Sequence, residues 1–342
     1  PGAGLWWGNA CGDWPPLVVF LQRNVLTEPG TQLAVEFVPV HPAVSNRYAW
    51  VSVEAQPRWL EPSRVVARLD PAARRVDLEL ENVSRLALDL SAFARPRGER
   101  APLLPAGSPI HIRADELEFE TPFDDPAKEI YLGRTAEGRW AQRDRLGPWY
   151  KAPHRAGPFK EAFQNRMVFV YGTHGTPEEN AWSYAKARYD HETWRYRGNG
   201  AVDVVPDVEF EAAAYAGRNV VLYGHRELNS AWSQVLGAGA FGVGRGALYV
   251  GDRRVEGDDL ALLAVYPRQG EDAASVAVVA GTGMAGMRTT DHLPYFVSGV
   301  AYPDWVVLDA SFLELGLEGV RGAGFFRDDW SPQEGAEEAW RE

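Results

Sequence analysis

The sequence predicts two regions of different architecture, a β-sandwich domain followed by an α/β domain with a mainly parallel sheet. Between residues 33 and 145, short segments alternate apolar and polar side chains with period two, as half-buried strands do. Between residues 167 and 225, a strand, a glycine turn, a helix and a second strand follow one another, which is the order of a βαβ unit. A chain of 342 residues is long enough for two domains.

The β-sandwich is predicted from seven segments that are separated by turn residues such as Asp70-Pro71 and Glu81-Asn82. These predicted strands comprise residues 33–38, 48–53, 64–69, 75–80, 85–90, 110–114 and 129–132. The segment 147–160 is rich in Gly and Pro, which is typical of a linker. We therefore expect four parts: a short helical remnant at 1–24, the sandwich at 25–146, the linker at 147–160, and the α/β domain at 161–342.

The α/β domain is predicted from a buried strand at 167–171 and a helix from Thr176 to about residue 196. Thr176 offers a capping hydroxyl, and Pro177 occupies the first helical position. Further strands are predicted at 218–223, 260–266, 275–280, 305–308 and 320–326, and the glycine-rich stretch 237–247 is predicted to loop over the sheet edge.

Composition limits the classes of partner and cofactor. The net charge of −12 argues against a nucleic-acid partner, because phosphate binding needs a basic face. No run of about 18 apolar residues occurs, so no membrane span is predicted. Cys11 is the only cysteine, and no group of His, Cys or acidic residues has metal-ligand spacing. Neither a disulfide, a metal site nor another cofactor is therefore predicted.

A dinucleotide-binding fingerprint, Gly281-Thr-Gly-Met-Ala-Gly286, follows a predicted strand, and Asp309 lies where a ribose-binding acid would be expected. The residues after the fingerprint form a poor helix that contains Pro294, whereas a dinucleotide site needs a regular helix at the pyrophosphate. We interpret the motif as a tight structural turn and keep a nucleotide-dependent oxidoreductase only as a weak alternative.

Two turns that follow strands of the predicted sheet form the candidate ligand-binding site. Their residues are Gly172, Thr173, His174 and Gly175 in the first turn, and Gly224, His225 and Arg226 in the second. Open α/β sheets bind ligands at the carboxyl ends of their strands, and backbone N–H groups at a helix start attract anions. The alternative is that both histidines make only local hydrogen bonds. No catalytic residue is predicted, since no G-x-S-x-G elbow occurs and Cys11 has no histidine nearby in sequence.

The first segment, Pro1-Gly-Ala-Gly-Leu-Trp-Trp-Gly8 followed by Asp13-Trp-Pro-Pro16, predicts a loop and then a capped helix to about residue 21. This segment resembles the end of the catalytic domain in bacterial prolyl-oligopeptidase-like α/β-hydrolases, a family of esterases and peptidases. Further stretches resemble the C-terminal extension of the same proteins; they are residues 81–86, 157–163, 219–224, 295–299, 302–305, 324–326 and 329–330.

In that family the first loop carries the histidine of the catalytic triad, and the matching position here is Leu5. Leucine accepts no proton, so Leu5 cannot act as a general base. The family's nucleophile and acid belong to sequence that would precede Pro1. The resemblance therefore implies a non-catalytic C-terminal region of a serine hydrolase, which supports or gates a site formed with an upstream catalytic domain. Because the chain begins with Pro1 instead of Met, we expect a fragment or a processed chain.

The residues also leave open a carbohydrate- or partner-binding assembly protein without enzymatic activity. The 13 Trp and 13 Tyr side chains can stack on sugar rings where they are exposed, although core packing explains them as well. The hydrolase hypothesis makes the apolar face of the helix at 14–21 a surface that needs a partner. That partner is the upstream domain or another protein chain, and an oligomer is compatible with it. A periplasmic or extracellular location is slightly favoured.

Overall fold

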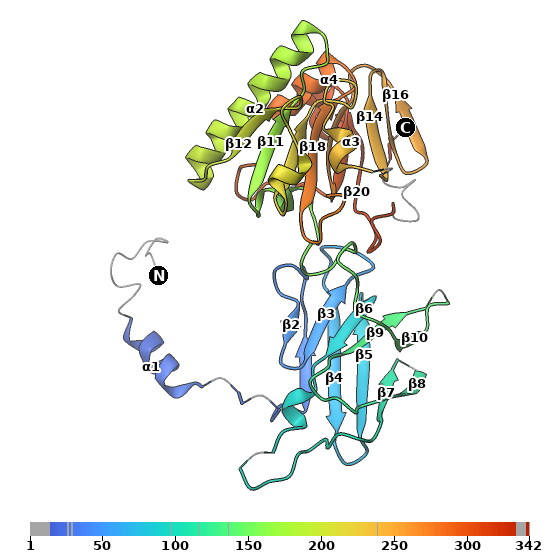
Figure 1. Cartoon of the computed structure of the whole chain (residues 1–342). Helices are drawn as coiled ribbons and strands as arrows, with labels where there is room; N and C mark the ends of the chain where they lie inside the picture. Colours follow the sequence, from blue (N-terminus) through green and yellow to red (C-terminus); the bar gives the residue numbers. More distant parts are fainter. Residues whose placement is uncertain are drawn as a thin grey trace.

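The computed structural model describes residues 14–332 and 340–341, apart from residues 26, 29, 97, 116, 136 and 238. Leu5, Cys11 and the rest of the segment 1–13 lie outside the described residues. Figure 1 shows a β region (blue to green) and an α/β region (green to red) placed one above the other. The predicted fold class is confirmed in its coarse form: largely antiparallel sheets are combined with a mixed sheet that contains several parallel strands.

The β region consists of two five-stranded sheets that bury a common core. One sheet has the order β1 (Ala34–Phe37), β4 (Arg64–Asp70), β5 (Arg75–Glu81), β7 (Ile110–Ala114) and β8 (Leu117–Thr121). The other has the order β10 (Trp140–Gln142), β9 (Ile130–Arg134), β6 (Arg85–Leu88), β3 (Val51–Ala55) and β2 (Arg47–Tyr48). Alternate residues of both sheets, such as Val53 and Ile112, are fully buried in this core, which explains the period-two pattern of the sequence.

Three details of the β region differ from the sequence prediction. β8 and β10 were not predicted, because the described residues of β8 are largely exposed and polar and β10 is only three residues long. The predicted strand at 48–53 is divided into β2 and β3 at Ala49, which has a positive φ of 51°. β5 and β7 pair in parallel, whereas the other neighbouring strands of the two sheets are antiparallel.

The α/β region is built on one seven-stranded sheet. Its order is β12 (Asp203–Pro206), β11 (Met167–Tyr171), β13 (Asn219–Tyr223), β18 (Ser275–Gly281), β17 (Ala261–Pro267), β19 (Trp305–Leu308) and β20 (Val320–Gly324). The first four strands pair in parallel, and the remaining three pairings are antiparallel. The sheet is therefore mixed, and the prediction of a mainly parallel sheet holds only for its first half. Strands buried on both faces have continuous apolar runs, which do not reveal their direction.

Both faces of this sheet are covered. Phe169 and Val221 face a core that is closed by α2 (Pro177–Gly198) and the 3-10 helix η3 (Phe159–Phe163). Val170 and Leu222 face a second core, closed by α3 (Trp232–Val235) and by a small sheet. That sheet consists of β14 (Phe241–Gly244), β15 (Ala247–Val250) and β16 (Arg253–Glu256), so the glycine-rich stretch 237–247 contains a strand and is not simply a loop. The remaining short helices are η2 (Ser91–Phe93), η4 (Ala212–Tyr215), α4 (Met284–Thr289), η5 (Thr290–His292), α5 (Phe312–Leu315) and η6 (Gly316–Gly319).

The glycines of the fingerprint allow neighbouring backbone segments to approach each other closely. Gly281 ends β18, and Gly286 lies in α4, a helix of six residues. A Cβ atom on Gly286 would lie 2.0 Å from the carbonyl oxygen of Leu260, and one on Gly281 would lie 2.2 Å from the nitrogen of Met287. Protein backbone thus occupies the space that these glycines leave open, which supports the interpretation of a structural turn.

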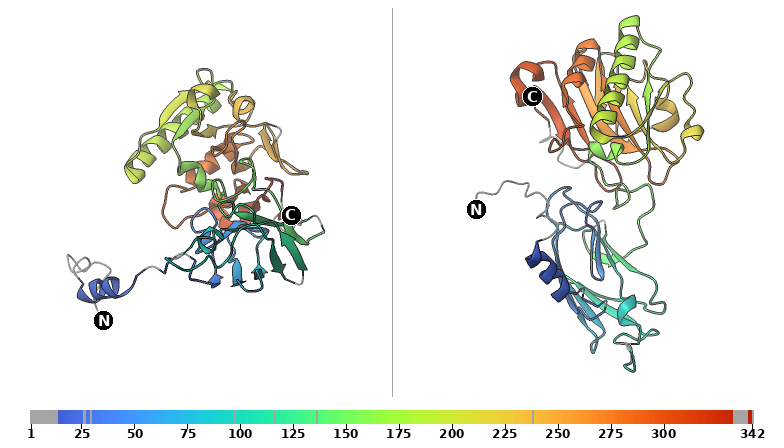
Figure 2. Two further views of the ribbon diagram at one scale, coloured as in Figure 1. Left: turned by 60° about the horizontal axis from the view of Figure 1, so that its bottom comes forward. Right: turned by 90° about the vertical axis from the view of Figure 1, so that its left-hand side faces the viewer.

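Helix α1 (Pro15–Arg23) stands apart from both regions, as Figures 1 and 2 show. None of its residues is buried, and Phe20 and Leu21 are 59% and 63% exposed. Within the described residues, no helix combines the length and the apolar character needed to cross a bilayer.

The two regions meet around a buried ion pair. Lys151 Nζ lies 2.5 Å from Asp304 Oδ2, and both side chains are fully buried. The ring of Trp59 from the β region lies 4.1 Å from Nζ, and the ring of Trp330 from the α/β region lies 5.3 Å from it. Arg155 is fully buried as well. The segment that the sequence predicts as a linker therefore also contributes buried charges to the contact between the two regions.

Replacing Asp304 by Asn should lower the free energy of unfolding by about 3 kcal/mol, because Lys151 would stay buried without its carboxylate. Urea unfolding measures this change. Asp125→Asn is the matched control, since Asp125 pairs with Lys128 at 3.9 Å on the surface, where both side chains are more than half exposed. An Asp304→Asn protein as stable as the control protein would contradict the role given to the buried pair.

Candidate functional site

The two predicted turns lie together at one edge of the mixed sheet. β11 and β13 are parallel neighbours, and their last residues, Tyr171 and Tyr223, are paired in register. The turn 172–175 follows β11, and the turn 224–226 follows β13. Asp207 follows β12, the parallel neighbour on the other side of β11. The carboxyl ends of three parallel strands therefore bring these residues together.

Asp207 organises the first turn. The hydroxyl of Thr173 donates to Asp207 Oδ1 at 2.6 Å, while His174 Nδ1 and the backbone N–H of Ser230 lie 2.9 Å and 2.6 Å from Oδ2. The side chain of Asp207 is fully buried, whereas that of His174 is 51% exposed. Burial opposes ionisation of Asp207, but the hydrogen bonds from Thr173, Ser230 and His174 outweigh it and lower the pKa of this carboxyl group.

The pair of His174 and Asp207 fixes the orientation of an exposed imidazole. Because an ionised carboxylate only accepts hydrogen bonds, Nδ1 of His174 carries a proton, and in the neutral imidazole Nε2 is the acceptor. Within the described residues, no hydroxyl or thiol forms a hydrogen bond with this Nε2. The hydroxyl of Ser230 interacts with Asp207 instead. The pair can therefore accept a hydrogen bond or a proton from a ligand, and among the described residues no side-chain nucleophile is bonded to it.

The second turn is largely buried. Gly224 and His225 are buried, and Arg226 is exposed. Gly224 has a φ of +95°, and a Cβ atom there would lie 2.4 Å from the side chain of Leu228. His225 Nε2 lies 3.4 Å from Glu179 Oε1. His225 therefore bonds within the protein and does not face a ligand, as the alternative interpretation of the sequence expected. Arg226, by contrast, lies on a surface that a ligand can reach.

The backbone N–H groups that were expected to hold an anion are bonded within the protein. The N–H of Gly172 donates to Ser183 Oγ at 2.9 Å, and that of Gly175 donates to Asn180 Oδ1 at 2.8 Å. At the start of α2, the N–H of Thr176 donates to Glu179 Oε2 at 2.7 Å, which completes a capping box. The protein's own side chains thus take the place that an anion would occupy.

Glu179 also joins the turn to the small sheet. Arg245, between β14 and β15, donates from Nη2 to Glu179 Oε2 at 2.6 Å and from Nε to Oε1 at 3.1 Å. Burial opposes ionisation of Glu179, but the bonds from Arg245, the backbone of Thr176 and His225 outweigh it and lower the pKa of Glu179 to about 2.

Four further residues of the site are not marked by any motif in the sequence; they are Asp207, Glu179, Ser230 and Arg245. Asp207 was missed together with β12, whose residues are only partly buried and so give no strong strand pattern. Arg245 lies in the stretch that was predicted as a loop.

Within the part of the chain that the structure describes, no cluster of three or more His, Cys, Asp or Glu side chains could hold a metal ion. Comparison of the chain with protein-family models, curated proteins and solved structures gave no match.

Replacing Glu179 by Gln should lower stability at pH 7 and flatten the acid dependence of stability. The pKa of Glu179 falls from 4.5 to about 2 on folding, so its contribution is complete above about pH 4.5 and is lost as the pH falls towards 2. We expect the free energy of unfolding at pH 7 to fall by on the order of 1–2 kcal/mol. This value is kept small because Arg245 is half exposed and solvent screens its charge.

Urea unfolding of both proteins at pH 7 and pH 3 measures this effect, and the difference between them should shrink at pH 3. Glu178→Gln is the control from the same helical turn, because Glu178 is exposed and pairs with Arg288 on the surface. If the wild-type and Glu179→Gln proteins lost stability in parallel between these pH values, the proposed charge pairing would be wrong.

Proposed function

We propose that this chain is the non-catalytic C-terminal region of a prolyl-oligopeptidase-like serine hydrolase and that helix α1 anchors it to an upstream catalytic domain. The exposure of α1 is the observation that carries the proposal. Residues 17–21 are five successive apolar side chains, and all of them are exposed. Successive helical residues are rotated by about 100°, so these side chains cover the whole circumference of the helix. A helix that is hydrophobic all round is typical of a protein interior.

The free energy available from covering α1 is large enough for an anchor. Full burial of one Val, Leu or Phe side chain stabilises by about 1.5–3 kcal/mol. Within the described residues, α1 has no buried residue, so the described part of the chain does not supply this stabilisation. A hydrolase domain that ends in this helix would supply those contacts by packing α1 as its last element.

An anchored α1 would hold the two folded regions close to the catalytic domain. The connection at 24–33 reaches at most about 35 Å when it is fully extended. At the sheet edge, the described part of the chain presents His174 without a nucleophile bonded to it. These features support a role in covering or gating a neighbouring site rather than in forming a covalent intermediate.

Phe20→Asp should weaken association with the catalytic domain, because a charge would enter the predicted apolar contact. The test produces residues 1–342 and the upstream catalytic domain as two chains and follows their association by sedimentation velocity. We expect the wild-type pair to sediment together and Phe20→Asp to weaken association at least about tenfold, which corresponds to about 1.4 kcal/mol.

Val44→Asp is the matched control, since Val44 is an apolar residue of the β region that is 82% exposed. It should leave association unchanged. The proposal fails if the wild-type chain does not associate, or if the Phe20→Asp and Val44→Asp proteins associate equally well.

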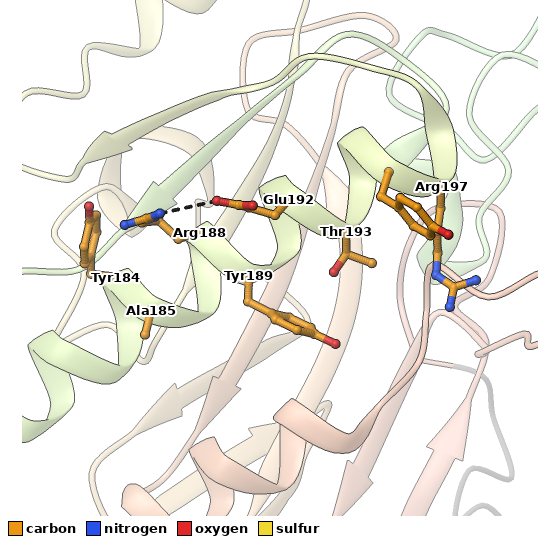
Figure 3. A pocket seen from close by; sticks show the side chains of 8 residues that line it. Tyr184, Ala185, Arg188, Tyr189, Glu192, Thr193 and Arg197 are labelled. Atoms are coloured by element: carbon orange, nitrogen blue, oxygen red, sulfur yellow. Dashed lines mark hydrogen bonds and ion pairs between the residues drawn. The ribbon is translucent and has the colours of Figure 1, made fainter.

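Carbohydrate or partner binding is the second candidate function, and a row of exposed tyrosines on α2 favours it. Most of the described Trp side chains are core residues; the buried ones are Trp50, Trp59, Trp140, Trp182, Trp232, Trp305 and Trp330. By contrast, Tyr184, Tyr189 and Tyr196 are exposed and line a shallow pocket of about 700 Å³ (Figure 3). Arg188 lies 5.8 Å from the ring of Tyr184 and pairs with Glu192 at 3.3 Å. Exposed rings beside charged hydrogen-bonding groups suit the stacking of a sugar ring.

Tyr189→Ala should weaken carbohydrate binding if this second function holds, because it removes the ring near the middle of the row. Affinity electrophoresis through gels that contain soluble polysaccharides is the measurement, and the loss should be about tenfold. Tyr48→Ala is the control, since Tyr48 is an exposed tyrosine of the β region. Unretarded migration of the wild-type protein in every polysaccharide would exclude the carbohydrate version of this function.

A further inference from the structure

A cavity of about 470 Å³ lies between the turn after β13, helix α3 and the strands β14 and β15. This volume is in the range of small-molecule sites. The cavity adjoins the Asp207 cluster, because Ser230 lines it and also donates its backbone N–H to Asp207. The function proposed above does not use this cavity, so a ligand site here would stand whether or not the chain belongs to a hydrolase.

The inner wall of the cavity is aromatic and rigid. Trp232 and Phe241 are buried, and their ring centroids lie 6.3 Å apart at an angle of 70°. Trp232 donates its ring N–H to the carbonyl oxygen of Gly224 at 3.0 Å, which fixes the ring. Tyr249 on β15 pairs with Gly242 on β14, and its ring packs over this glycine. A Cβ atom on Gly242 would come within 2.5 Å of the tyrosine ring. The wall therefore offers flat apolar surfaces to a ligand without rearrangement.

The mouth of the cavity carries one arginine whose charge is only weakly paired. Arg226 is 57% exposed, and its Nε lies 3.5 Å from Glu227 Oε1. The other oxygen of Glu227 lies 3.1 Å from Nδ1 of His225. The backbone N–H of Leu228 donates to His225 Nδ1 at 3.2 Å, so Nδ1 is an acceptor and gives no hydrogen bond to Glu227. The distance of 3.5 Å between Arg226 and Glu227 is long for a charge-assisted hydrogen bond, so the guanidinium of Arg226 can bind a carboxylate.

We infer that this cavity binds a small molecule with a flat aromatic body and a single carboxylate. The aromatic body lies against Trp232, Phe241 and Tyr249, and the carboxylate accepts hydrogen bonds from Arg226. A doubly charged phosphate fits less well, because Glu227 lies next to Arg226 and repels a second negative charge.

Two fluorinated probes test this assignment on the full chain by ¹⁹F NMR titration. 4-Fluorophenylacetate has the ring and the charge, whereas 4-fluorophenylacetamide has the same ring without the charge. The wild-type protein should bind the acid more tightly than the amide. Arg226→Gln should weaken the acid about tenfold and leave the amide unchanged, because it removes only a charge-assisted hydrogen bond. Tyr249→Ala should weaken both probes, because it removes part of the aromatic wall.

Arg254→Gln is the control, since Arg254 is an exposed arginine on the neighbouring strand β16. It should change neither affinity. Arg226→Lys should restore part of the acid binding, and equal thermal unfolding of the wild-type and Arg226→Gln proteins checks that the fold is intact. The inference is overturned if the wild-type protein does not bind the acid in the millimolar range. It is also overturned if Arg226→Gln leaves acid binding unchanged or weakens both probes equally.

Discussion

The contact between the two regions depends on a pair of opposite charges that is sealed from water. Lys151 and Asp304 lose their hydration on folding, and burial lowers the pKa of the amine and raises that of the carboxyl group, while each partner opposes the shift of the other. Such a pair is stable only at close distance and in good geometry. Because Trp59 of the β region covers the amine, the pair fixes how the β region meets the α/β region.

The same requirement, that buried polar groups find partners, shapes the edge of the mixed sheet. Asp207 collects three donors, and Glu179 collects donors from α2 and from the small sheet. These bonds make the edge a rigid frame, from which His174 and Arg226 extend to the surface. A frame of this kind is suited to recognition, because its exposed groups are held in place before a ligand arrives.

The sequence was sufficient for elements whose signals are local. β11 and β19 have the predicted bounds, and the hydroxyl and proline at Thr176 and Pro177 begin α2 as expected. The sequence was insufficient where long-range contacts decide the structure. The burial of Lys151 depends on Asp304, which lies 153 residues away, and the direction of β17 depends on pairing that an apolar run does not encode. For the candidate site, the sequence pointed to the two turns but not to Asp207 and Arg245, because these two residues lie in segments without strong periodicity.

The length of α1 has a consequence for the anchoring role that we propose for it. Isolated helices shorter than about 12 residues are marginal in water, and α1 has nine residues without a buried neighbour. The helix alone is therefore marginally stable, and under the proposed anchoring, contact with the catalytic domain would complete it at the moment of binding. Part of the interaction free energy is then consumed in ordering the segment, which makes attachment reversible and sensitive to the shape of the receiving surface.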